Sequence, residues 1–291
     1  MLVKGASRQA PEWGGGVARQ PLRGCTYGEE RAGGGGSART PTSDPRSSGT
    51  ASALAATRTY AIQPLYVLPR DAEGSLGAGG TIGRSVAAMQ RWFTQQAGGA
   101  RLRVVAGSVP TVCLPETDAQ IAAHGAQVRD RLEELLRGEG YDDPHRLYAV
   151  WYDGTSTFSC GGGAWPPELL GHVAALYLQG HYTADGQPVD CSQDRFSSDG
   201  MTVEINELKM LHEILHTLGL VGRRAPHHTR DGHTSDNPTD LMYAGPLAWE
   251  PSVLDVGHDD YYLTGRTDIP DLSRSVFLDP LPVDPAPPPG W

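Results

Sequence analysis

The chain has 291 residues, enough for one large domain or two small ones with a substantial core. Hydrophobic residues make up 38% and charged residues 20%, as in ordinary globular proteins, and the 37 glycines and 23 prolines predict long loops. The net charge of −10 argues against a protein that binds nucleic acid or anionic membranes. No apolar run reaches the roughly 18 residues of a membrane-spanning helix, so we expect no membrane span.

Composition divides the chain into three parts. Residues 1–57 form a low-complexity leader that cannot bury enough apolar surface to order itself, and we expect it to be disordered. The leader has no continuous apolar stretch of the kind found in a signal peptide. We expect residues 58–270 to form a single folded domain and residues 271–291 to form an extended Pro-rich tail.

Within this domain, short β-branched and aromatic runs alternate with longer segments of helical periodicity. We expect strands at 60–68, 101–106, 147–152 and 172–178. We expect helices at 81–97, 118–136 and 202–218, and a last helix beginning within 255–262. The three consecutive glycines at 161–163 predict a loop. This order of elements predicts an α+β fold, in which a mixed sheet is backed by helices.

The helix predicted at 202–218 carries the most informative motif, because residues 212–216 read His-Glu-Ile-Leu-His. Two histidines four residues apart project from one face of a helix and can bind one metal ion together. A glutamate between them, here Glu213, acts as the general base in zinc hydrolases. The leucines that predict the buried face of this helix are Leu208, Leu211, Leu215 and Leu218. Gly219 follows as a natural end of the helix.

The four cysteines are Cys25, Cys113, Cys160 and Cys191. None of their spacings is C-x-x-C, so we do not expect a cysteine metal site. Cys160 and Cys191 flank a Gly/Pro-rich segment, and we expect them to form a disulfide while the other two stay free. Such a disulfide indicates an oxidising compartment.

Residues 212–219, His-Glu-Ile-Leu-His-Thr-Leu-Gly, resemble the first eight residues of the extended motif of the metzincin zinc peptidases. In that motif the glycine lets the chain leave the helix and bring round a third ligand. The resemblance is specific over about 207–245 and loose over 60–265. It implies a zincin-type catalytic domain with one catalytic zinc ion.

Residues 240–243, Asp-Leu-Met-Tyr, resemble the metzincin Met-turn. The resemblance implies that Met242 packs beneath the metal. It also suggests that Tyr243 hydrogen-bonds a developing oxyanion, although the corresponding tyrosine of some metzincins stands two residues after the methionine rather than one.

The third ligand departs from the metzincin pattern. Metzincins place it three residues after the glycine, where this chain has Gly222, which has no side chain to bind a metal. Either the site is inactive or the ligand comes from later in a longer loop. We favour His233, because the segment 232–236, Gly-His-Thr-Ser-Asp, precedes the Met-turn as in similar bacterial secreted-type peptidases. His228 and His227 are the alternatives.

These residues predict a zinc-dependent endopeptidase. Zinc held by His212, His216 and His233 would lower the pKa of a water molecule, and Glu213 would take its proton. A protein or peptide substrate would lie along an edge strand, for which we expect residues 172–178. The alternatives are a non-catalytic metal-binding or recognition module on the same fold, and a zinc hydrolase that acts on another class of substrate.

Three further expectations concern the aspartates near the site, the oligomeric state and the location of the protein. Asp231, Asp236 and Asp240 are expected to form Asx-turns, to orient the histidines, or to bind a structural cation such as Ca²⁺. We expect the protein to be a monomer. The predicted disulfide favours a secreted or cell-surface location.

Overall fold

The computed structural model describes residues 59–77 and 79–291, and the predicted leader lies outside this part of the chain. Its centre is a five-stranded sheet with the order β3-β1-β4-β6-β5. The strands are β1 (Ala61–Leu68), β3 (Thr111–Cys113), β4 (Arg146–Tyr152), β5 (Gly161–Trp165) and β6 (Leu169–Tyr177). All neighbours pair in parallel except β5, which runs antiparallel to β6. The predicted mixed sheet is therefore confirmed.

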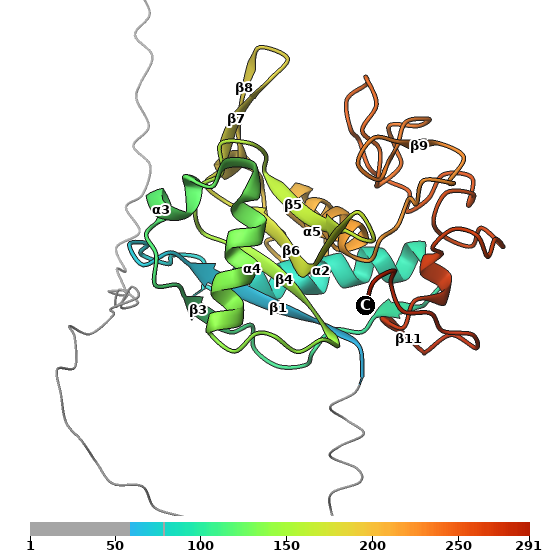
Figure 1. The fold of residues 1–291 in the computed structure, drawn as a ribbon, viewed down its shortest axis with the longest axis horizontal. Coiled ribbons are helices and arrows are strands. Elements are labelled where there is room, and N and C mark those ends of the chain that lie inside the picture. Colours follow the sequence, from blue (N-terminus) through green and yellow to red (C-terminus); the bar gives the residue numbers. More distant parts are fainter. Residues whose placement is uncertain (1–58, 78) are drawn as a thin grey trace, which may run out of the picture.

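Helices cover both faces of this sheet (Figure 1). α2 (Thr81–Gln96) and α5 (Ile205–Thr217) lie on one face, and α4 (Val128–Gly138) lies on the other. Alternate residues of β4 point to opposite faces, so Trp151 packs in the core beside α2 and α5 while Val150 packs in the core beside α4. No helix of the described residues is long and apolar enough to cross a membrane.

The single helix predicted over 118–136 is wrong, because the chain breaks there. α3 (Asp118–Ala122) and a 3₁₀ turn (Gly125–Gln127) precede α4. Gly125 has φ 57°, a left-handed conformation that a continuous α-helix cannot contain. The apolar stripe is nevertheless shared by both pieces, since Ile121 and Leu132 are buried in the same core.

The edge of the sheet beside α5 also differs from the expectation. Residues 172–178, expected to form the edge, fall almost entirely in β6, which lies between β4 and β5. The true edge is β5, whose three glycines we expected to form a loop. The edge strand lies against α5, because a glycine strand can approach a helix more closely than any other.

The predicted disulfide between Cys160 and Cys191 is confirmed. It joins the start of β5 to the end of a hairpin made of β7 (His181–Ala184) and β8 (Gln187–Asp190), which a 3₁₀ turn (Cys191–Gln193) follows. The expectation of a free Cys113 is wrong, since Cys113 is disulfide-bonded. The expectation for Cys25 lies outside the described residues.

After α5 the chain has little regular structure (Figure 1). β9 (His228–Thr229) and β10 (His233–Thr234) form a short antiparallel ladder. The last helix expected within 255–262 is wrong, because this segment is a turn. The Asp255 carboxylate accepts the N–H groups of Tyr261 and Tyr262 at 2.9 and 2.6 Å, which holds the backbone in a non-helical path.

The C-terminal segment packs on the domain. A 3₁₀ turn (Leu272–Arg274) leads to β11 (Leu278–Asp279), which pairs with β2 (Arg101–Leu102). The strand expected over 101–106 is thus shorter, and only an isolated bridge from Val104 to Ile62 continues it. Trp291 stacks on His172 with ring centres 4.1 Å apart. The Pro-rich segment therefore packs against the core, although its backbone is extended.

Candidate metal centre

Helix α5 is held at both ends by its own sequence. Glu204 and Glu207 form a capping box at its start, so the helix begins later than the predicted residue 202. At its end, Gly219 has φ 72°, and the Leu220 N–H donates to the Leu215 carbonyl at 3.2 Å. The four predicted core leucines of this helix are buried. These contacts fix the orientation of the face that carries the histidines.

Three histidines converge on this face of α5. The Nε2 atom of His216 lies 2.9 Å from Nε2 of His212 and 3.1 Å from Nε2 of His233. His233 comes from the loop after α5, where it pairs with Thr229 across β9 and β10. The structure thus brings together the three residues that the sequence favoured.

The hydrogen bonds of the outer ring nitrogens show what this cluster can bind. His212 Nδ1 donates to the Leu241 carbonyl at 2.7 Å, and His233 Nδ1 donates to the Arg230 carbonyl at 3.1 Å. A neutral imidazole carries one proton, so Nε2 of both rings presents a lone pair to the centre of the cluster. Lone pairs aimed at one point repel one another unless a donated proton or a cation lies between them, and a metal ion can accept all of them at once. The donor set therefore fits a metal ion.

Zinc fits the spacing of these nitrogens. With Zn–N distances of 2.0–2.1 Å, two ligands of a tetrahedral zinc ion lie about 3.3 Å apart. Burial, together with the neighbouring histidines, lowers the pKa of His212 to about 3 and that of His216 well below its usual value. Burial also lowers the pKa of His233. All three rings are thus held neutral, which is the form that binds metals.

Glu213 lies between this cluster and the edge strand. Burial raises the pKa of its carboxyl to about 8, opposed by a hydrogen bond from the Gly163 N–H and by the charge of Lys209. Lys209 is itself paired with Asp194 at 2.5 Å. A carboxyl group with a pKa near neutrality can both accept and release a proton.

The glycines of β5 make this arrangement possible. A Cβ atom at Gly163 would lie 2.6 Å from the Glu213 carbonyl oxygen and 2.7 Å from the Cβ of His216. A Cβ atom at Gly161 would overlap the Glu213 carboxylate. Only glycine therefore lets the edge strand lie directly over the motif.

The segment resembling a Met-turn lies under the cluster. The buried Asp240 carboxylate accepts the Met242 N–H at 2.7 Å, and burial raises the pKa of Asp240 to about 6. Met242 is fully buried, and its carbonyl accepts the Thr234 N–H at 2.9 Å, next to His233. The turn therefore supports His212 through Leu241 and His233 through its neighbour.

A cavity of about 260 Å³ opens beside the histidines. The residues that line it are Ser159, Cys160, Gly161, Tyr182, Lys209, His212, Glu213, His233, Tyr243 and Trp249. The Tyr243 hydroxyl accepts the Leu247 N–H at 3.0 Å, which leaves its own proton free to donate. The indole of Trp249 meets the His212 ring edge-on, with centres 5.7 Å apart. The cavity thus combines a carboxylate, a hydroxyl and the metal-binding face.

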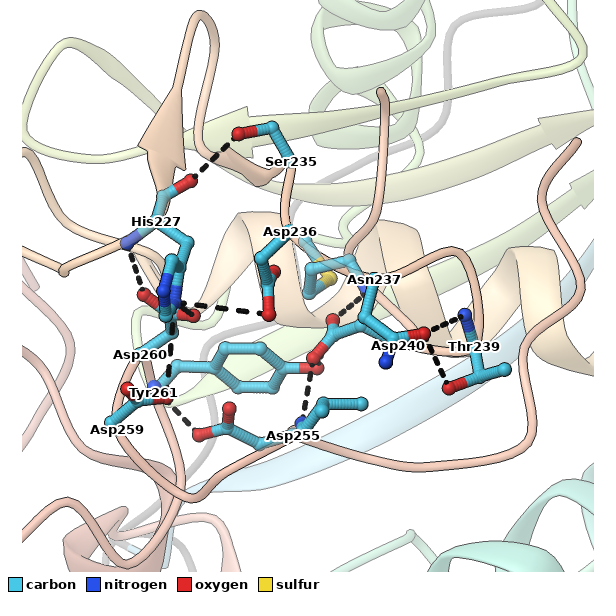
Figure 2. A network of polar contacts seen from close by, with 12 residues as sticks. His227, Ser235, Asp236, Asn237, Thr239, Asp240, Asp255, Asp259, Asp260 and Tyr261 are labelled. Atoms are coloured by element: carbon cyan, nitrogen blue, oxygen red, sulfur yellow. Dashed lines mark hydrogen bonds and ion pairs between the residues drawn. The ribbon is translucent and has the colours of Figure 1, made fainter. Parts of the chain in front are cut away.

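The other ligand candidates lie away from the cluster. His228 donates to the Val221 carbonyl at 3.0 Å and stacks on Trp165, and His227 pairs with Asp260 at 2.9 Å (Figure 2). Gly222, at the position of the metzincin ligand, lies against Pro270.

Sequence reasoning missed the hairpin that presents His233. The dipeptide Asp231-Gly232 could have revealed it, because Asp-Gly between two strands is a strong hairpin signal. In the structure these two residues form the turn, with φ angles of 64° and 76°. The same reasoning also missed the role of the β5 glycines.

Comparisons with known proteins identify no family. No family model matches the chain, and no curated protein matches it. One matching solved chain comes from the "Structure of a chaperone-substrate complex", with 14% sequence identity and a TM-score of 0.32. That match covers 70% of this chain and 32% of the other, so the chain spans about a third of its length. A likeness of this size supports no inference about fold or function.

Proposed function

We propose that the protein is a zinc-dependent endopeptidase of zincin type, with His212, His216 and His233 as the metal ligands. The observation that carries the proposal is the convergence of three Nε2 atoms beside the Glu213 carboxylate. A purely structural metal site needs no carboxyl group in this position, whereas a hydrolase needs a base there. Bound zinc supplies a Lewis acid that polarises a carbonyl group and lowers the pKa of water.

Glu213 would move the protons of the reaction. As the water attacks a peptide carbonyl, the Glu213 carboxylate takes its proton and later gives it to the leaving amine. The Tyr243 hydroxyl would donate to the negative charge that develops on the carbonyl oxygen, since its proton is not engaged elsewhere. The buried surroundings of Glu213 strengthen both interactions by excluding water.

The substrate backbone would pair with β5. This strand ends the sheet, and an extended peptide would pair with the outer groups that remain available, since the Gly163 N–H donates to Glu213 and the Gly161 carbonyl accepts the Ser159 hydroxyl. The start of β5 at Gly161 lines the same cavity as Glu213 and His212. A peptide bound along β5 would therefore pass directly over the metal-binding histidines.

The Cys160–Cys191 disulfide supports a secreted or cell-surface location for such a peptidase. We also propose that the protein acts as a monomer on proteins or peptides, because every proposed catalytic group comes from one chain.

The test is Glu213→Gln, which keeps the shape of the side chain but removes the base. We expect zinc content to stay at one ion per chain and hydrolysis of casein to fall about 10²–10⁴-fold. The control is Glu250→Gln, at an exposed glutamate outside the cavity, which should leave both values unchanged. Casein hydrolysis at the normal rate by Glu213→Gln would exclude this mechanism. Zinc binding without hydrolysis of any peptide by the wild-type protein would favour a non-catalytic metal-binding module.

A further inference from the structure

A second cluster of potential metal ligands lies outside the proposed catalytic site. The carboxylates of Asp255, Asp259 and Asp260 come together in the turn after the Met-turn segment, with oxygens within 4.8 Å of one another (Figure 2). Asp255 is 1% exposed and Asp260 is fully buried. Three carboxylates in so small a volume repel one another strongly when all are ionised and water is excluded.

The hydrogen bonds of this cluster leave two oxygens without a hydrogen-bond donor. Oδ2 of Asp255 accepts the N–H groups of Tyr261 and Tyr262, but its buried Oδ1 atom accepts none. Oδ1 of Asp259 is also shielded from solvent and accepts no hydrogen bond; its ion-pair contact is with His227 Nδ1, at 3.9 Å. A buried carboxylate oxygen without a donor is costly unless something positive binds it.

Positive charge near the cluster is scarce. Among the described residues, neither Lys nor Arg forms an ion pair with these three aspartates. Within residues 59–77 and 79–291, their one cationic partner is His227, whose Nδ1 lies 2.9 Å from Asp260, 3.9 Å from Asp259 and 3.8 Å from Asp236. A single imidazolium cannot compensate four carboxylates.

We infer that Asp255, Asp259 and Asp260 form a second metal site, which binds Ca²⁺. Ca²⁺ takes six to eight oxygen ligands in flexible geometry, and three carboxylates with free lone pairs supply the charged part of that shell. Water molecules would complete it on the side of the half-exposed Asp259, whose side chain is 45% accessible. His227 orients Asp260 from outside this shell.

The site differs from the one expected from the sequence. Asp240, one of the expected residues, has both carboxylate oxygens engaged by Met242, Val256 and Tyr261. Asp231, another of them, lies at the tip of the β9–β10 hairpin, and its side chain is 76% exposed. Neither is therefore available to this cation.

Binding there would hold the loop that carries His233. Asp260 accepts the backbone N–H of His227 at 2.8 Å as well as its ring N–H, so fixing Asp260 fixes the start of the loop 227–236. This inference goes beyond the proposed peptidase activity, because the cation stabilises the loop whether or not the chain hydrolyses peptides.

The experiment is a titration of the full chain, loaded with zinc, with Tb³⁺ and then with Ca²⁺. Tyr261 and Tyr262 adjoin the site and should sensitise Tb³⁺ luminescence, which Ca²⁺ should quench by displacement. Calorimetry with Ca²⁺ alone gives the affinity. We expect Asp259→Asn to weaken Ca²⁺ binding at least about tenfold, because charged ligands set the affinity of such sites. The Asp259 carboxylate loses only its contact with His227 at 3.9 Å, so this variant should keep the fold.

The matched control is Asp185→Asn, in the turn between β7 and β8, where φ is 49° and asparagine is well tolerated. It makes the same change of charge and should leave Ca²⁺ affinity unchanged. Glu213→Gln should also bind Ca²⁺ normally, which separates this test from that of the catalytic proposal. No Ca²⁺ binding up to about 10 mM, equal weakening in Asp185→Asn, or displacement of Tb³⁺ by Zn²⁺ but not by Ca²⁺ would overturn the inference.

Discussion

His233 reaches the metal-binding face of α5 because the hairpin of β9 and β10 reverses the chain just before it. The two histidines of this hairpin have different neighbours: His228, in β9, stacks on Trp165, and His233, in β10, lies against His216. Neighbouring positions across a ladder thus place one ring in the cluster and the other on the edge strand. The assignment of the third ligand rests on this difference.

The assignment predicts different zinc affinities for two alanine variants. His233→Ala removes one of three ligands, so we expect zinc affinity to fall by more than the roughly 10–100-fold typical of losing an outer hydrogen-bond partner. His228→Ala should retain one zinc ion per chain, because the His228 ring stacks on Trp165, outside the histidine cluster. Competition with a chromophoric chelator measures both affinities. Zinc lost from His228→Ala but kept by His233→Ala would reverse the assignment.

At the scale of elements, the contact between β5 and α5 positions the proposed base. The edge strand donates the Gly163 N–H to Glu213, and the helix presents Glu213 toward that strand, one residue round from His212. Because the strand has no side chains over 161–163, its backbone lies where side chains would otherwise separate the two elements.

Alanine in β5 should therefore have effects that depend on position. In Gly163→Ala the new methyl group meets the helix backbone, so we expect a loss of about 1–3 kcal/mol in the free energy of unfolding. In Gly161→Ala it meets the movable Glu213 carboxylate, so we expect a lower kcat at nearly unchanged stability. The control Gly83→Ala, with open space around it in α2, should stabilise the protein by about 0.5–1 kcal/mol. Urea unfolding and casein hydrolysis measure the two effects, and equal stability of all three variants would contradict this account.

At the scale of the molecule, local patterns predicted local structure well. Helical periodicity predicted α2 and α5, and the spacing of His212 and His216 predicted that both rings share one face. The edge role of β5 and the acidic cluster at Asp260 were not predictable in this way, because each depends on contacts between segments distant in the chain. The hairpin that contains His233 was missed for another reason. Its strands, β9 and β10, have two residues each and are too short to show the alternation of a strand.

The Cys160–Cys191 disulfide connects these distant segments, because it fastens the β7–β8 hairpin to the start of the edge strand. Its cysteines are 31 residues apart, and closing a loop of that size restricts the unfolded chain by about 3–4 kcal/mol at 25 °C. Replacing both cysteines by serine should lower the free energy of unfolding by a similar amount, measured by urea denaturation with the m-value fitted.

The double variant avoids the free thiol that a single variant would leave, and it spares the disulfide of Cys113, which a reducing agent would also break. Zinc content, measured in parallel, shows whether the histidine cluster still forms. A double variant as stable as the wild type would mean that the hairpin is held by its other contacts, and that β5 does not depend on the disulfide for its place over α5.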